Sequence, residues 1–119
     1  MIERRIVSVL FADLVGFTSL SESLDAEDVA SVQAAYFDTV RDTIERYDGR
    51  LEKFIGDAAM AVFGVPRTRD DDAERALRAG LALAAAIDRL AAQIGLESGA
   101  LAVRVGVNTG EVVHTPDAG

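Results

Sequence analysis

The chain has 119 residues and a formal net charge of −8, half of its residues are hydrophobic, and it contains no cysteine. This length allows one domain with an apolar core, and the composition excludes a disordered chain. The acidic balance argues against sequence-independent binding of nucleic acid, and the lack of cysteine excludes disulfides and thiol chemistry. No apolar run approaches the length of a membrane span, so we expect a cytoplasmic protein with no membrane segment in this chain.

The first predicted elements are a strand and a long helix. Residues 5–12 are rich in Val, Ile, Leu and Phe, which is typical of a mostly buried strand. Asp25 is placed to cap a helix of about 22 residues, roughly 33 Å long at 1.5 Å per residue. Gly49 is placed to end that helix.

A hairpin follows the helix. Residues 51–55 and 58–63 are predicted strands, and Gly56 and Asp57 connect them. Glycine in the first position of a two-residue connection fits a type II′ turn.

A second helix and another strand complete the pattern. The acidic residues at 70–72 suit the N-terminus of a helix, which continues to Ala91 with an alanine-rich face that can pack closely on a sheet. Residues 101–107 are a predicted strand, and residues 110–113 are expected to begin a further segment. The order strand, helix, strand, strand, helix, strand predicts an α+β fold, the ferredoxin-like βαββαβ sandwich.

This topology brings two aspartates together. The first and third strands are antiparallel neighbours, so Asp13 at the end of the first meets Asp57 just before the third. Two adjacent carboxylates repel each other without a counter-charge, and a divalent metal ion supplies one. Each aspartate also has an ordinary structural interpretation, Asp13 as a local cap and Asp57 as a turn residue.

Three other features bear on ligand binding. The turn from Leu14 to Thr18 includes Gly16, which lets backbone amides approach phosphate oxygens, although it also fits an ordinary strand-to-helix turn. Lys53 alone is best interpreted as a lysine on an exposed sheet face. Arg104 interrupts an apolar strand, so it needs an anionic partner or an open sheet face. His114, the one histidine, is assigned no role.

Four ordered motifs resemble the catalytic domain of class III adenylate and guanylate cyclases, of the bacterial adenylate cyclase type. They are Val9-Leu-Phe-Ala-Asp-Leu-Val-Gly-Phe-Thr18, Glu52-Lys-Phe-Ile-Gly-Asp-Ala58, Met60-Ala-Val-Phe-Gly64 and Val103-Arg-Val-Gly-Val-Asn-Thr-Gly110. The resemblance implies a phosphorus–oxygen lyase that converts ATP to cyclic AMP and pyrophosphate in cyclic nucleotide signalling.

The resemblance also implies roles for individual residues. Asp13, Asp57 and the backbone of Leu14 match the ligands of two Mg²⁺ or Mn²⁺ ions. Lys53 matches the lysine that recognises adenine, and Arg104 matches an arginine directed at the terminal phosphates. The phosphate-contacting loop corresponds to Gly16, Phe17 and Thr18. Because the family works as a head-to-tail homodimer, Lys53 is expected to serve the partner's nucleotide.

The resemblance covers the N-terminal portion of the family domain. We therefore expect residues 1–119 to be a partial domain, without the family's transition-state Asn and Arg, and to have little activity alone. Two alternatives remain open. One is a non-catalytic cyclase-like module that dimerises or binds nucleotide, and the other is a guanylate cyclase, which Lys53 disfavours.

Overall fold

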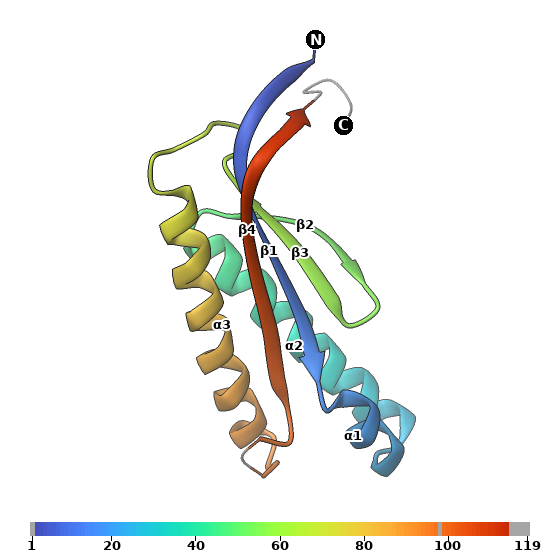
Figure 1. The fold of residues 1–119 in the computed structure, drawn as a ribbon. Coiled ribbons are helices and arrows are strands. Elements are labelled where there is room, and N and C mark those ends of the chain that lie inside the picture. Colours follow the sequence, from blue (N-terminus) through green and yellow to red (C-terminus); the bar gives the residue numbers. More distant parts are fainter. Residues whose placement is uncertain (1, 98, 115–119) are drawn as a thin grey trace.

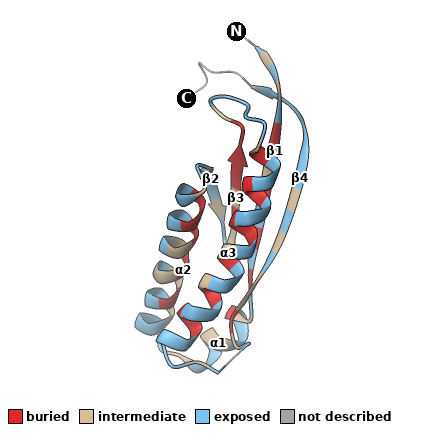
Figure 2. Cartoon of the chain, turned by 90° about the vertical axis from the view of Figure 1, so that its left-hand side faces the viewer, coloured by how far each residue is buried: buried red, intermediate tan, exposed pale blue. Residues whose placement is uncertain are grey.

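The structure, a computed structural model, describes residues 2–97 and 99–114 (Figure 1). Its strands form one antiparallel sheet in the order β2-β3-β1-β4, and α2 and α3 cover one face of this sheet (Figures 1 and 2). The elements in chain order are β1 (Glu3–Val15), α1 (Phe17–Ser23), α2 (Ala26–Arg46), β2 (Arg50–Ile55), β3 (Ala58–Phe63), α3 (Asp72–Gln93) and β4 (Ala102–His114). This arrangement confirms the ferredoxin-like prediction.

The first and last strands, β1 and the edge strand β4, are longer than predicted. β1 runs to Val15, so Asp13 lies inside the strand rather than after it. β4 continues to His114, so the prediction of a separate segment at 110–113 is wrong. The physical reason is that β4 pairs with β1 along its whole length, from Val15 opposite Ala102 to Glu3 opposite His114. Figure 1 shows these two strands extending together beyond the rest of the sheet.

Helix α2 begins as predicted and ends differently. The Asp25 carboxylate accepts a hydrogen bond of 2.9 Å from the Asp28 backbone N–H, which confirms the cap. At the other end, Asp48 and not Gly49 adopts the left-handed conformation, with φ of 59°. Gly49 donates its N–H to the Ile44 carbonyl at 2.9 Å, and an added Cβ would lie 2.6 Å from the Phe63 ring. The glycine is therefore needed for close packing.

The core lies between the covered face of the sheet and the two long helices, where buried residues face one another in Figure 2. Leu10 of β1, Tyr36 of α2, Phe63 of β3 and Ile87 of α3 are all completely buried. Small residues on α3 allow the close approach predicted from its alanine-rich face. Within the part of the chain that the structure describes, no helix is both long and apolar enough to cross a membrane.

An ion-pair network that the sequence did not predict fixes the start of α3. Arg75 is buried and pairs with the buried Asp72 and with Asp71. The Arg75 guanidinium also donates to the Tyr47 carbonyl at 2.7 Å, and its carbon lies 5.6 Å from the centre of the Phe63 ring. The hydrogen bond from Arg75 lowers the pKa of Asp71. Arg75 thus ties the start of α3 to the end of α2.

Candidate functional site

The two predicted metal ligands lie beside each other at the start of β3. Asp13 of β1 is the register partner of Ala58, the first residue of β3, and Asp57 directly precedes Ala58. Gly56 has φ of 59°, as the first position of a type II′ turn requires, and Asp57 has no positive φ. The hairpin turn therefore carries Asp57 to the same edge as Asp13, as the topology predicted.

Two side chains of α2 hold Asp57, and the sequence reasoning missed both. The Tyr36 hydroxyl donates to the Asp57 backbone carbonyl at 2.8 Å. The Gln33 amide donates to the Asp57 carboxylate at 3.4 Å. A signal was present in the sequence, because Tyr36 places a polar group on the apolar face of the helix, where a buried hydroxyl needs a partner. Gln33 lies one helical turn before it.

The negative charges of Asp13 and Asp57 also affect the pKa of the Tyr36 hydroxyl. Burial raises the pKa of Tyr36 to about 12, with smaller contributions from the negative charges of Asp13 and Asp57. A phenolate beside two carboxylates would add a third negative charge, so the phenol stays protonated. Asp13 and Asp57 therefore both contribute to the raised pKa of this one hydroxyl.

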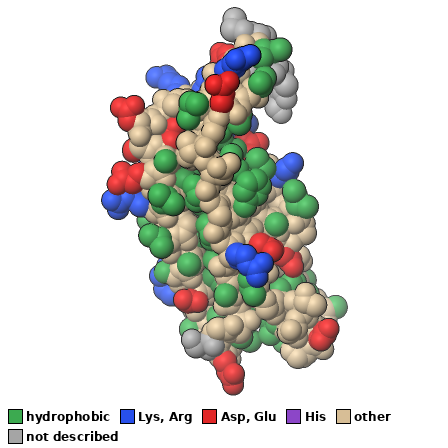
Figure 3. Space-filling view, in the orientation of Figure 1, with side chains coloured by type: hydrophobic (Ala, Val, Ile, Leu, Met, Phe, Trp, Pro, Cys, Tyr) green, Lys and Arg blue, Asp and Glu red, His purple; other side chains and the backbone are tan. Residues whose placement is uncertain are grey.

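Asp13 has a basic neighbour on its other side. Arg104 of β4 is the register partner of Asp13, and both side chains are exposed on the face that the helices leave uncovered. They line a hollow of about 380 Å³, which we call the Asp13–Arg104 groove, together with residues of β1, β3 and β4. Figure 3 shows this face of the molecule, with acidic and basic side chains adjoining among hydrophobic ones. The open sheet face predicted for Arg104 is confirmed.

Lys53 lies on the same uncovered face because of an irregularity in β2. The pairing of β2 with β3 shifts by one residue between Leu51 and Lys53. Leu51 and Phe54 are half-buried, whereas Glu52 and Lys53 are both exposed. A β-bulge of this kind re-aims the residues that follow it. It directs Lys53 away from the helices, two strands away from β1 in the sheet.

The loop after β1 is tightly constrained. Gly16 has φ of 91°, and an added Cβ would clash with the Ala100 carbonyl oxygen. Phe17 begins α1 and is buried, while Thr18 is exposed. Beyond Asp13, β1 pairs with β4 alone, so Leu14 has no partner in β3. The predicted short helical turn is confirmed, and the backbone from Leu14 to Thr18 lies next to Asp13 in the chain.

The donor set fits a hard divalent cation with open coordination positions. Asp13 and Asp57 offer carboxylate oxygens, the ligand type that Mg²⁺ and Mn²⁺ prefer. Among the described residues no third His, Cys, Asp or Glu joins them, and no Lys or Arg lies within 4.0 Å of either carboxylate. Mg²⁺ sites commonly combine one or two carboxylates with substrate phosphates and water. Two carboxylates are therefore sufficient for such a site.

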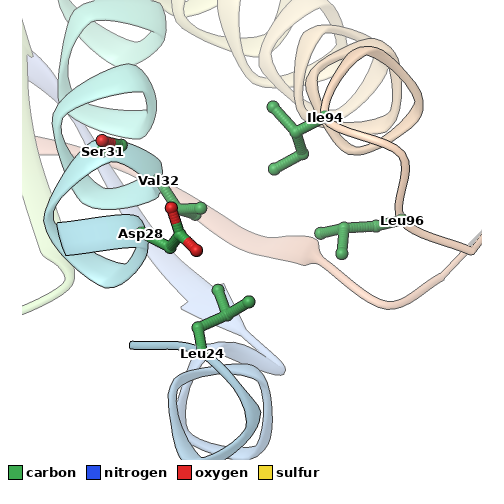
Figure 4. Close-up of a pocket in the computed structure, with 6 residues that line it drawn as sticks. All are labelled: Leu24, Asp28, Ser31, Val32, Ile94 and Leu96. Atoms are coloured by element: carbon green, nitrogen blue, oxygen red, sulfur yellow. The ribbon is translucent and has the colours of Figure 1, made fainter. Parts of the chain in front are cut away.

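Other hollows on the described part of the chain have a different character. One of about 320 Å³ lies between the start of α2 and the end of α3 (Figure 4). It is lined by Leu24, Asp28, Ser31, Val32, Ile94 and Leu96. Another, of about 490 Å³, is an apolar groove between α3 and β4. Neither contains Asp13, Asp57, Lys53 or Arg104.

Sequence comparison agrees with the fold. Residues 2–117 match the family described as the adenylate and guanylate cyclase catalytic domain. An uncharacterized protein of Mycobacterium tuberculosis (strain ATCC 25618 / H37Rv) is 36% identical over 112 residues, which are 93% of this chain and 19% of that protein. An uncharacterized protein of Rhizobium meliloti (strain 1021) is 36% identical over 107 residues, 90% of this chain and 10% of that protein. The chain thus spans about a fifth or less of these curated relatives.

Solved structures of cyclases are also similar to this chain. The crystal structure of the adenylyl cyclase CyaB from P. aeruginosa superposes with a TM-score of 0.87 and 33% identity, over 95% of this chain and 60% of that one. The crystal structure of the guanylyl cyclase Cya2 gives a TM-score of 0.82 and 38% identity, over 93% and 57%. Sequence, topology and structural similarity agree, and the chain belongs to the adenylate and guanylate cyclase catalytic domain family.

Proposed function

We propose that this chain belongs to an adenylate cyclase, in which the ribose 3′-hydroxyl of ATP attacks its own α-phosphorus. The new bond joins O3′ to the α-phosphorus, the bond from that phosphorus to the oxygen bridging to the β-phosphate breaks, and the hydroxyl proton passes to water. The products are cyclic AMP and pyrophosphate. The observation that carries the proposal is that Asp13 and Asp57 lie beside each other at the start of β3, with Arg104 opposite Asp13.

Asp13, Asp57 and the backbone of Leu14 would hold two Mg²⁺ or Mn²⁺ ions. When bound, the ions neutralise phosphate charge and make the attacking hydroxyl more acidic. The two aspartates place negative charge beside Ala58, and among the described residues no Lys or Arg lies within 4.0 Å of either carboxylate. That charge favours a cation-bound triphosphate over a free one.

The remaining residues bind and orient the nucleotide. Arg104 has a fixed positive charge and a planar donor group suited to phosphate oxygens, and it lies beside Asp13 on the adjoining strand. The first amides of α1, at Phe17 and Thr18, lack acceptors within the helix and can donate to phosphate. Gly16 lets the backbone turn there.

Lys53 would select the base. A lysine ammonium donates to acceptors on a purine edge, so it favours adenine N1 over the protonated N1 of guanine. We propose that Lys53 acts on the nucleotide of a partner subunit in a head-to-tail dimer. The exposure of Lys53 on the uncovered sheet face supports this role. A guanylate cyclase remains the second candidate, because Cya2 is 38% identical to this chain and is named a guanylyl cyclase.

The proposal is tested with the protein expressed from its complete gene, since this chain covers about 60% of the matched structures. We expect Mn²⁺-dependent formation of cyclic AMP from ATP. Asp13→Asn and Asp57→Asn should each lower the rate by at least about 100-fold, because each removes a ligand of the ions that stabilise the charge developing on the phosphates. Asp38→Asn, an exposed carboxylate on α2, is the matched control. Retained activity in both site variants would contradict the proposal.

Substrate choice is tested by comparing ATP with GTP. Wild-type protein should favour ATP, and Lys53→Glu should reduce the ratio of kcat/KM for ATP to that for GTP by about 10-fold or more. Glu52→Lys, which alters charge at the adjacent exposed position, controls for nonspecific electrostatics. A wild-type preference for GTP would favour the guanylate cyclase. Tight nucleotide binding with no product from either substrate would favour the non-catalytic module.

A further inference from the structure

We infer that Tyr36 and Gln33 of α2 are positioning residues, which hold Asp57 beside Asp13 so that both carboxylates face one cation. The inference rests on the proposed metal-binding function. Neither residue is expected to touch metal or nucleotide, and both act through Asp57. Asp57 lies in a two-residue turn, and its own strand pairing begins only at Ala58.

The contacts from Tyr36 and Gln33 restrain different parts of Asp57. Tyr36 donates to the backbone carbonyl at 2.8 Å, which fixes the turn. Gln33 donates to the carboxylate oxygen Oδ1 at 3.4 Å, which restrains rotation of the side chain. Together they fix both where Asp57 sits and where its carboxylate points. Contacts of this kind to metal ligands commonly change metal affinity by 10- to 100-fold.

Packing within the core restrains the two side chains that donate to Asp57. Tyr36 is completely buried and its ring lies 5.6 Å from that of Phe37, which itself stacks 4.2 Å from Phe54 of β2. The contact of Phe37 with Phe54 therefore anchors the helix that carries Tyr36 to the hairpin whose turn the hydroxyl contacts. Gln33 is half-buried three residues earlier on the same helix face. A rigid helix is a more accurate support for Asp57 than the turn alone.

The chain contains a matched control for each residue. Its other tyrosine is Tyr47 and its other glutamine is Gln93, and neither contacts Asp57 in the structure. The test variants are Tyr36→Phe and Gln33→Met, and the controls are Tyr47→Phe and Gln93→Met. Gln33→Met keeps the length of the side chain and removes both amide donors, so it changes positioning with little risk to folding.

The first readout is the binding of Mn²⁺ to the purified chain. The concentration of free Mn²⁺ is measured by electron paramagnetic resonance, at a temperature below the unfolding transition. We expect each test variant to raise the Kd by about 10-fold, and each control to stay within about twofold of wild type. Asp13→Asn identifies the site, because it should abolish the same binding. A residue with only a packing role would lower the unfolding temperature and leave the Kd unchanged.

The second readout needs no metal. Backbone ¹⁵N relaxation at Gly56 and Asp57 should show a lower order parameter in Tyr36→Phe than in wild type and Tyr47→Phe, falling from about 0.85 toward 0.6. If Mn²⁺ binding depends on Asp13 but both test variants bind like wild type, the inference is overturned and the proposed function stands. If wild type shows no Asp13-dependent binding of Mn²⁺, the proposed function fails. In that case the inference is overturned as well if the order parameter at Asp57 is the same in Tyr36→Phe as in wild type.

Discussion

Asp13 of β1 and Arg104 of β4 are direct register partners on the uncovered face of the sheet, so an acidic and a basic side chain share one groove. The described residues include no ion pair between them. A nucleoside triphosphate with bound cations presents positive and negative groups side by side. The Asp13–Arg104 groove offers a complementary charge to each.

Replacing Arg104 should weaken binding of phosphate-rich ligands selectively. Arg104→Gln removes a charged donor, which is worth about 1.5–3 kcal/mol in a hydrogen bond, or roughly 10- to 100-fold in Kd. We expect that loss for Mn²⁺-ATP and a much smaller one for AMP, measured by calorimetry. Arg78→Gln on α3, whose partner is Glu74, is the control. Equal losses for ATP and AMP would remove Arg104 from phosphate binding.

Gly16 should tolerate substitution less well than a glycine that shares only its backbone conformation. Gly16 and Gly95 have φ of 91° and 80°, but an added Cβ clashes with the Ala100 carbonyl oxygen only at Gly16 and meets nothing within 4 Å at Gly95. Gly95→Ala should cost about 1–2 kcal/mol from the left-handed conformation alone. Gly16→Ala should cost clearly more in the free energy of urea unfolding, and equal costs would argue against the close approach of Ala100.

The buried Arg75–Asp72 pair should matter more to stability than any exposed ion pair. Arg75→Met leaves the Asp72 charge buried without its partner and frees the Tyr47 carbonyl, so we expect a loss of about 3–5 kcal/mol. Arg78→Met breaks the exposed pair with Glu74 and should cost less than about 1 kcal/mol. Denaturant unfolding of the two variants measures the difference. Similar losses would mean that burial adds nothing to the Arg75 pair.

Much of the fold could be predicted from the sequence because local patterns and topology agree. The apolar run before Asp13, the cap at Asp25 and the glycine turn before Asp57 each specify an element or its end. Once the order of elements indicated a split βαβ fold, the meeting of Asp13 with Asp57 followed from antiparallel pairing.

What the sequence did not predict depends on contacts between distant residues. The contact of Tyr36 with Asp57 depends on how α2 packs on the sheet, and the bulge before Lys53 depends on the register of β2 with β3. The length of β4 follows from its pairing with the start of β1, which its own composition does not reveal. Asp72 was predicted only as one of three acidic residues at a helix start, and its pairing with Arg75 depends on the tertiary packing that buries both.

The Tyr36 hydroxyl should give a resolved titration at high pH. The chain has two tyrosines and no tryptophan, so the near-ultraviolet absorbance of tyrosinate reports Tyr36 and Tyr47 alone. Tyr36 should ionise near pH 12, and Tyr36→Phe should remove that step. Asp13→Asn should lower the pKa of Tyr36, because it removes one of the two negative charges that raise it. A single step for both tyrosines at the ordinary pKa would contradict the buried contact with Asp57.

The same group makes stability depend on pH in a defined window. The native state holds the Tyr36 proton up to about pH 12, whereas the unfolded chain releases it near pH 10.0. Native protein therefore binds more protons between these values, so the free energy of unfolding falls as pH rises through them. A shift of roughly two pH units corresponds to about 2–3 kcal/mol. Other groups titrate there too, so the measured quantity is the difference between wild type and Tyr36→Phe in urea unfolding. The free energy of unfolding of wild type minus that of Tyr36→Phe should fall by roughly this amount from pH 10 to pH 12, and no such fall would contradict the raised pKa of Tyr36.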